Sequence, residues 1–257
     1  MRSRLILTLL ALLVLGYAGI CALLYFKQRD LIYFPAATAV PIQATDFSLL
    51  RDGTTLRGWK LNPGKQRALI YFGGNAERLE HSRETFGQLF PDRTVYLLAY
   101  RGYGASEGQP SESALFGDAL ALYDAVKAEH AGEEIAVIGR SLGSGVASYL
   151  AAQRPVEKLV LVTPFDSLAE VAQAHYRWLP GRWLIRDRYA STQYLKQYAG
   201  PLLVLRAGRD EVIPSANTDR LVASMARPPT VVDFPHADHN SIATDPGYDR
   251  ALSDFMR

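Results

Sequence analysis

The segment Gly139-Arg140-Ser141-Leu142-Gly143 constrains the fold of this chain more than any other. It directly follows the apolar run 135–138, which predicts a buried strand, and leads into the small-residue stretch 144–152, which predicts a helix. A G-x-S-x-G between a strand and a helix is typical of a nucleophile elbow, a tight turn that holds the serine at the carboxyl edge of a sheet. We therefore take Ser141 as a candidate nucleophile, with an ordinary Gly-Ser loop as the alternative.

Composition narrows the class of protein. A length of 257 residues suits one domain with an appendage, and 48% hydrophobic with 21% charged residues is typical of a globular chain rather than a disordered one. A formal net charge of +2 with no basic stripe argues against a nucleic-acid partner. The single cysteine, Cys21, excludes an internal disulfide and a cysteine-based zinc site, and the five histidines show no H-x-x-x-H spacing. We therefore expect no metal.

The amino terminus has the composition of a membrane span. Residues 5–26 carry no charge, and about 20 apolar residues suffice for a helix to cross a bilayer. The run is longer than the apolar core of a cleaved signal peptide, and no convincing cleavage site closes it. We predict an uncleaved signal anchor over residues 1–30, with a cleaved signal as the alternative. Within the span, Cys21 is interpreted as a small apolar residue, and a lipidated cysteine is the alternative interpretation.

The orientation of this anchor follows from its flanking charges. Arg2, Arg4 and the terminal amine precede the apolar run, whereas Lys27 and Arg29, partly offset by Asp30, follow it. The positive-inside rule gives a slight preference for an internal amino terminus. The sequence thus predicts a single-pass membrane protein whose globular domain lies on the extracytoplasmic side, periplasm-like or lumenal.

Residues 31–257 are predicted to form one α/β domain. An Asp-Gly turn at 52–53 joins two expected strands into a hairpin. Beyond it, short apolar runs typical of buried parallel strands alternate with helical stretches such as 113–130. This alternation predicts a mostly parallel central sheet with helices on both faces, whose chemistry gathers at the carboxyl ends of the strands. The expected strands are 45–50, 54–61, 68–72, 95–100, 135–138, 159–162, 202–205 and 231–234.

A serine nucleophile needs a base to take its proton and an acid to orient that base. Asp210 follows the expected strand 202–205, so we assign it the acid role, with Glu211 as its competitor. Two histidines follow the last expected strand. We favour His239, which lies deeper in the loop just before the terminal helix, over His236, which we expect to point to solvent.

Acyl transfer also requires fixed N–H donors for the oxyanion. The residue after the nucleophile, Leu142, supplies one such donor in an elbow of this kind. The second is expected from the loop after strand 68–72, where Gly73 and Gly74 let the backbone approach a substrate closely. We therefore propose the Asn75 N–H as the second donor, against the alternative of an ordinary Gly-Gly turn.

Taken together, these motifs resemble the α/β-hydrolase superfamily, in particular the branch of the BEM46-like proteins and the ABHD12/13/17-type serine hydrolases. The resemblance covers nearly the whole chain, including the apolar amino terminus, and departs at Gly73, where many relatives carry histidine. It implies the α/β-hydrolase fold with the order serine, acid, histidine. The matching segments are 71–77 (YFGGNAE), 100–108 (YRGYGASEG), 139–143 (GRSLG), 163–167 (TPFDS), 208–214 (GRDEVIP) and 239–240 (HN).

The stretch 165–198 is too long for a minimal connection and is rich in aromatic residues. We predict a short cap over the pocket, called the cap segment below. Its aromatic side chains are expected either to line an acyl site or face lipid, or to pack the cap onto the core.

The sequence as a whole predicts a serine hydrolase that cleaves a carboxylic ester or thioester of a small or lipid-like acyl substrate through an acyl-enzyme. Ser141 would attack, His239 would carry the proton, and Asp210 would orient the imidazole; no cofactor is needed. A serine peptidase or a lysophospholipase on the same triad stays open. So does a binding scaffold without activity, because this fold also hosts such proteins.

Overall fold

The structure is a computed structural model that describes residues 2–257, and its centre is an eight-stranded sheet. The strand order is β1-β2-β4-β3-β5-β6-β7-β8, in which β1, β2 and β4 pair antiparallel and all pairs from β4 to β8 are parallel. The strands are β1 (Phe47–Arg51), β2 (Thr54–Leu61), β3 (Arg67–Phe72), β4 (Arg93–Leu98), β5 (Ile135–Arg140), β6 (Leu159–Val162), β7 (Leu202–Ala207) and β8 (Thr230–Phe234).

Helices cover both faces of this sheet, as predicted. Tyr71 on β3 packs edge-on against Phe86 of α2, with ring centroids 4.7 Å apart. Tyr96 on β4 pairs with Ile70, the residue before Tyr71, so it points to the opposite face, where its hydroxyl contacts His130 at the end of α3. The helices are α1 (Arg2–Ile32), α2 (Arg83–Leu89), α3 (Glu112–Glu129), α4 (Leu142–Gln153), α5 (Leu168–His175), α6 (Gly181–Leu184), α7 (Ser191–Tyr194), α8 (Ser215–Ala223) and α9 (Tyr248–Met256).

The strand predictions are confirmed, with two informative shifts at the site edge. The strand expected at 95–100 ends at Leu98, because Ala99 and Tyr100 leave the ladder to begin the glycine-rich turn that follows. The helix expected from residue 144 begins at Leu142, because Ser141 itself occupies the N-cap position. Both shifts place polar backbone at the carboxyl edge of the sheet.

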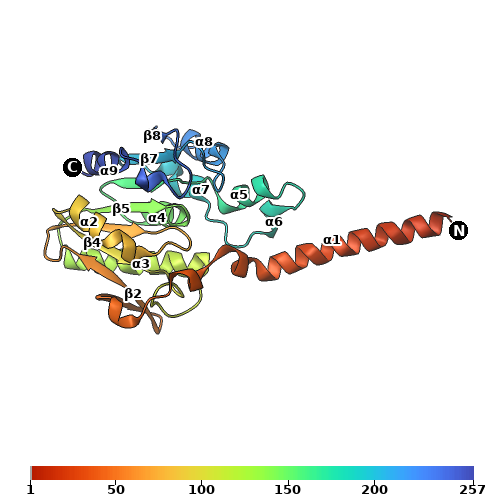
Figure 1. Cartoon of the computed structure of the whole chain (residues 1–257), viewed down its shortest axis with the longest axis horizontal. Helices are drawn as coiled ribbons and strands as arrows, with labels where there is room; N and C mark the ends of the chain where they lie inside the picture. Colours follow the sequence, from red (N-terminus) through yellow and green to blue (C-terminus); the bar gives the residue numbers. More distant parts are fainter. Residues whose placement is uncertain (1) are drawn as a thin grey trace.

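Helix α1 projects away from the rest of the molecule (Figure 1). By length and composition it could cross a bilayer, and the apolar side chains along its first two-thirds are exposed. Close to the body, the cap segment, which holds α5, α6 and α7 between β6 and β7, lies beside the carboxyl-terminal part of α1 (Figure 1). The apolar amino-terminal helix is thus in contact with the folded domain.

Candidate active site

Ser141 is the residue that links β5 to α4, and its backbone is strained. Its φ of 50° and ψ of −117° are unusual for a residue other than glycine. Such strain persists only where the surrounding structure enforces it, and it occurs often at reactive groups. The conformation is that of the sharp turn that the G-x-S-x-G pattern predicts.

The two glycines of the motif are needed because neighbouring backbone fills the space around them. A Cβ at Gly139 would lie 2.3 Å from the carbonyl oxygen of Gly143. A Cβ at Gly143 would lie 2.0 Å from the carbonyl oxygen of Phe72, at the end of β3. Helix α4 can therefore start close to β3, which keeps Ser141 beside the loop that follows β3.

The structure brings the three predicted residues together across the carboxyl ends of three strands. His239 Nε2 lies 2.8 Å from Ser141 Oγ, and His239 Nδ1 lies 2.8 Å from Asp210 Oδ2. The second oxygen of Asp210 accepts hydrogen bonds from the N–H groups of Val212 and Ile213, at 2.9 and 2.7 Å. Because the side chains of His239 and Asp210 are only 9% and 5% exposed, water competes little for these contacts.

The alternative candidates for the acid and the base lie outside the hydrogen-bonded chain from Asp210 to Ser141. Glu211 is exposed and its side chain makes no hydrogen bond to the described residues, although it lines the cavity described below. His236 is exposed in the loop after β8. A further buried acid near the site edge, Asp166, accepts hydrogen bonds from Asn217 and Arg220 at 2.8 and 2.6 Å, so it is committed elsewhere.

The loop after β3 lies against the serine. A Cβ at Gly74 would come within 3.5 Å of the Cβ of Ser141. The Gly74 N–H donates to Glu77 Oε2 at 2.6 Å, whereas the N–H groups of Asn75 and Leu142 find no acceptor among residues 2–257. Of the backbone donors in this loop, Asn75 is therefore available to a bound oxygen and Gly74 is not.

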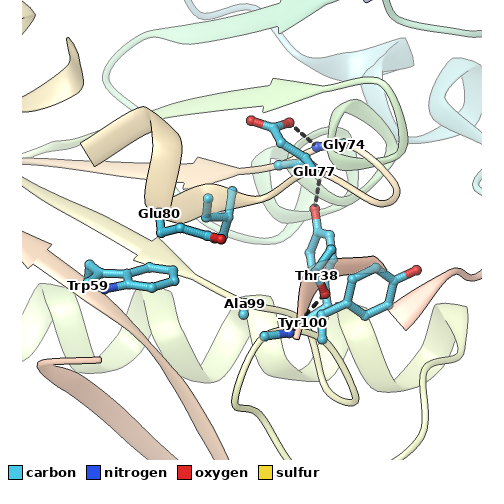
Figure 2. Close-up of a pocket in the computed structure, with 11 residues that line it drawn as sticks. Thr38, Trp59, Gly74, Glu77, Glu80, Ala99 and Tyr100 are labelled. Atoms are coloured by element: carbon cyan, nitrogen blue, oxygen red, sulfur yellow. Dashed lines mark hydrogen bonds between the residues drawn. The ribbon is translucent and has the colours of Figure 1, made fainter. Parts of the chain in front are cut away.

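Glu77 and Arg140 organise this edge, and the sequence reasoning did not identify either role. The Glu77 carboxylate accepts from Gly74 N–H (Figure 2), from Tyr71 Oη at 2.7 Å and from Arg140 at 3.1 Å. Arg140 also donates to the carbonyl oxygen of His239 at 3.2 Å. This network joins the Asn75 loop, the elbow and the histidine loop. The available signal was a carboxylate three residues after a glycine turn.

Burial changes the titration of this network. Burial raises the pKa of Tyr71 well above its ordinary value, and the neighbouring Glu77 charge raises it further. Burial alone would lower the pKa of Arg140, but the charge of Glu77 more than offsets this, so the pKa lies above its ordinary value. Tyr71 therefore stays a donor and Arg140 a cation at neutral pH.

The side chain of Asn75 ties the same loop to the end of α1. Its Nδ2 donates to the carbonyl oxygen of Ile32 at 2.5 Å, and its Oδ1 accepts from Tyr103 Oη at 2.6 Å. The Oδ1 also accepts from the backbone N–H of Phe34 at 3.3 Å. Both polar atoms of the side chain thus position the loop, and the backbone N–H has no acceptor among residues 2–257.

A cavity of about 890 Å³ opens at Ser141 and Leu142. One side of it is formed by the cap segment and the other by the carboxyl-terminal part of α1. A volume of this size is typical of small-molecule sites, about 300–1,000 Å³. The site therefore combines a serine–histidine–carboxylate arrangement with room for an organic substrate.

The cap aromatic residues divide between the two expected roles. Tyr189 is fully buried and packs against Phe116 of α3, while Tyr176 and Trp178 are exposed and line the cavity. Trp183 is 86% exposed. Packing onto the core and lining the pocket therefore both occur, in different parts of the cap segment.

The chain is similar to known proteins over most of its length. Residues 65–186 match the family described as serine aminopeptidase, S33. An uncharacterized protein of Mycobacterium tuberculosis is 37% identical over 91% of this chain and 88% of its own length. The α/β-hydrolase domain-containing protein WAV2 of Arabidopsis thaliana is 29% identical over 90% of this chain and 89% of its own. The lysophosphatidylserine lipase ABHD12 of Danio rerio is 33% identical over 63% of this chain and 50% of its own.

Solved structures share the fold. The esterase Pf2001 of Pyrococcus furiosus superposes with a TM-score of 0.65 at 17% identity, covering 82% of this chain and 90% of its own. Est1E of Butyrivibrio proteoclasticus, solved with ferulic acid, gives 0.66 at 17% identity, covering 82% and 98%. The fold, the elbow and the sequence relatives agree. The chain belongs to the α/β-hydrolase superfamily, in the branch that contains the ABHD12 proteins.

Proposed function

We propose that this protein is a serine hydrolase that cleaves carboxylic esters or thioesters through an acyl-enzyme intermediate. The observation that carries the proposal is the chain of two 2.8 Å contacts from Asp210 through the His239 ring to Ser141. Family membership makes hydrolysis the expected activity, and esterases share the fold.

The proposed reaction follows from the positions of these atoms. Ser141 Oγ attacks the substrate carbonyl carbon while His239 Nε2 takes the hydroxyl proton. Asp210 accepts a hydrogen bond from His239 Nδ1–H and stabilises the imidazolium. The N–H groups of Asn75 and Leu142 hold the oxyanion. His239 then gives the proton to the leaving alcohol or thiol. A water molecule, deprotonated by the same ring, then attacks the acyl-enzyme. The acyl–Oγ bond breaks, the carboxylic acid leaves, and His239 returns the proton to Ser141 Oγ.

A fluorophosphonate probe tests the nucleophile directly. The wild-type protein should be labelled, and Ser141→Ala should lose both labelling and hydrolysis of p-nitrophenyl butyrate. Ser148→Ala, a buried serine on α4 that bonds only to the helix backbone, is the matched control and should keep both. If the folded wild-type protein is neither labelled nor active, the scaffold interpretation replaces this proposal.

Peptidase activity is a second candidate, because the matched family is described as an aminopeptidase. An ester and an anilide with the same acyl group separate the two. Under the proposed function, kcat/KM for the p-nitrophenyl ester exceeds that for the p-nitroanilide of the same acid by far more than their intrinsic reactivities differ. A preference for the anilide with a free α-amino group would establish the peptidase instead.

We also infer that α1 anchors the protein in a membrane and that the substrate is a lipid-like acyl compound. Support comes from the exposed apolar surface of α1 and from the relative named as a lysophosphatidylserine lipase. Two of the three tryptophans, Trp178 and Trp183, are exposed on the cap segment, while Trp59 is buried. In vesicles with brominated acyl chains, wild-type fluorescence should be strongly quenched, and Trp178→Phe with Trp183→Phe should remove the quenched component.

The domain is proposed to lie on the extracytoplasmic side. Protease treatment of intact vesicles of known orientation tests this. Domain digestion only after the vesicles are opened, in right-side-out membranes, would place the domain in the cytoplasm and reverse the assignment.

A further inference from the structure

The cavity at Ser141 is walled by α1 as well as by the hydrolase domain. Four α1 residues with aliphatic side chains, Ile20, Leu24, Leu31 and Ile32, line it together with apolar residues of the cap segment. From Ile20 to Ile32 the helix advances about 18 Å at 1.5 Å per residue. The apolar wall therefore runs from the reactive serine a long way toward the amino-terminal end of α1.

Specific polar contacts hold α1 against the cap segment. Arg29 makes a bidentate ion pair with the buried Asp187, at 3.0 and 3.2 Å, and Tyr33 Oη donates to the same carboxylate at 2.9 Å. The amide of Gln28 donates to the carbonyl oxygen of Leu184 at 3.2 Å and accepts from the Arg186 N–H at 2.7 Å. Buried groups satisfied in this way fix the position of α1 relative to the cap segment.

The contact between α1 and the cap segment extends into the apolar run. Tyr17 Oη donates to the carbonyl oxygen of Trp178 at 2.9 Å. Tyr17 lies nine residues before Phe26, the last residue of the uncharged run, which is about 13 Å along the helix. When residues 5–26 span the bilayer, this part of the cap segment lies at the depth of the acyl chains. Trp178 itself and Trp183, elsewhere in the cap segment, are exposed.

From this arrangement we propose that α1 forms one wall of the acyl-binding site. A long acyl chain then reaches Ser141 from the bilayer, between α1 and the cap segment. The occupant is the acyl chain of a membrane lipid ester, because the cavity joins the reactive hydroxyl to a surface that faces lipid and its lining from α1 is almost wholly apolar. The inference rests on the proposed function and adds the residues that select chain length, with Leu24 at their centre.

Chain-length selectivity in the full-length protein tests the wall. Leu24→Trp narrows the cavity, and Leu23→Trp adds the same side chain at a neighbouring position that is 62% exposed and does not line the cavity. With p-nitrophenyl palmitate and butyrate in mixed micelles, Leu24→Trp should lower the palmitate-to-butyrate ratio of kcat/KM about tenfold, equivalent to one or two buried methylenes. Leu23→Trp should leave the ratio and both activities unchanged.

A second measurement does not depend on turnover or on tolerance of tryptophan. In a Cys21→Ser background, Leu24→Cys introduces a thiol into the wall. Labelling Ser141 with a hexadecyl fluorophosphonate should slow alkylation of this thiol by a membrane-permeant maleimide at least about fivefold, whereas an ethyl fluorophosphonate should not. Leu23→Cys in the same background is the control and should react equally after either probe.

The outcomes separate the two proposals. If wild-type Ser141 reacts with neither fluorophosphonate and neither ester is cleaved, the proposed function fails and this inference falls with it. If the short probe and butyrate react normally while Leu24→Trp leaves the ratio unchanged and the introduced thiol is not protected, the hydrolase stands and the wall is overturned. A change of oligomeric state in Leu24→Trp without a change of selectivity would show that a second copy, not a substrate, fills the cavity.

Discussion

Two walls meet at Ser141, and they present different chemistry to a substrate. On the sheet side, buried polar groups are satisfied by short contacts: His239 between Asp210 and Ser141, and Glu77 between Gly74 and Arg140. On the α1 side, the cavity lining is mostly aliphatic and aromatic, and polar contacts such as the Arg29–Asp187 pair hold α1 to the cap segment. A hydrogen bond needs a particular partner at a particular distance, whereas apolar packing tolerates changes of similar volume.

We therefore expect the sheet side to control the rate of the reaction and the α1 side to control which acyl chains are accepted. Changes on the sheet side should lower the rate for every substrate, since each substrate presents the same carbonyl. Changes on the α1 side should act according to the length of the acyl chain. The predictions below test this separation from either side.

The largest effect is expected at the base. His239→Ala removes the proton acceptor 2.8 Å from Ser141, and kcat should fall about 10⁴-fold or more for short and long esters alike. His236→Ala changes an exposed histidine earlier in the same loop and should stay within about twofold of wild type, as is usual for a surface change away from the site. The measurement is kcat on p-nitrophenyl butyrate and palmitate. Full activity of His239→Ala would refute the triad assignment.

A smaller loss is expected from the group that positions the Asn75 loop. Glu77→Gln weakens the contacts to Arg140 and Gly74 without removing an oxyanion donor, so kcat should fall about 10²-fold, the lower end of the loss of one such donor. KM should change little, because the acyl pocket is intact. Glu84→Gln, exposed on α2, is the control. A change confined to KM would assign Glu77 to substrate binding instead of positioning.

On the α1 side, Asp187→Asn should loosen the cap segment. It removes the charge that Arg29 pairs with, and the segment should open to trypsin about tenfold faster, as expected for loss of part of a buried pair. Cleavage within the cap segment, followed by mass spectrometry, is the measurement. Asp30→Asn changes an exposed acid next to Arg29 on α1 and should leave the cleavage rate unchanged. Equal cleavage rates in the two variants would mean that the ion pair does not hold α1.

The smallest effect is expected at the far end of the sheet. Glu157 lies just before β6. Burial alone would raise its pKa, but the hydrogen bonds from Arg93 and Arg67 lower the pKa by more, so it lies below its ordinary value. The carboxylate therefore stabilises the fold above the unfolded-state pKa of about 4.3, and this contribution is lost as the pH falls through the folded-state pKa. Glu157→Gln should cost about 1 kcal/mol of unfolding free energy at pH 7.

Urea unfolding in micelles at pH 7 and pH 3.5 checks this, and the difference from wild type should shrink at the lower pH. Asp92→Asn, whose carboxylate is exposed beside Arg67, should cost far less at pH 7. A difference that is the same at both pH values would show that the Glu157 charge is not the cause. Ester hydrolysis of the surviving folded protein should keep its chain-length preference.

Most of the sheet, and the edge that carries the reacting residues, could be predicted from the sequence because local residue patterns indicate both. The limits of β2 and β6 match the predicted runs, and the elbow follows from glycines whose added Cβ atoms would meet backbone. Asp210 and His239 could be placed because each follows an apolar strand, and parallel strands share a carboxyl edge.

The α1 wall could not be predicted in this way. The pair of Arg29 with Asp187 joins residues 158 positions apart, and neither lies in a motif. The apolar run 5–26 has nearly the same residue composition on every face of the helix, so the sequence does not indicate which side contacts the cap segment. Glu77 is similar: the sequence shows a carboxylate three residues after a glycine turn, but it does not show that Arg140 faces this carboxylate.

The contact of Gln28 with Leu184 also has a consequence for biosynthesis. The first 32 residues leave the ribosome long before the residues that hold them, since 156 positions separate these two partners. During translation the amide and guanidinium groups near the end of α1 therefore wait, hydrated or in contact with lipid headgroups, until most of the chain has been made. Closure of so long a loop is a slow kind of folding step. The α1 wall can therefore be completed only after the cap segment has been synthesised.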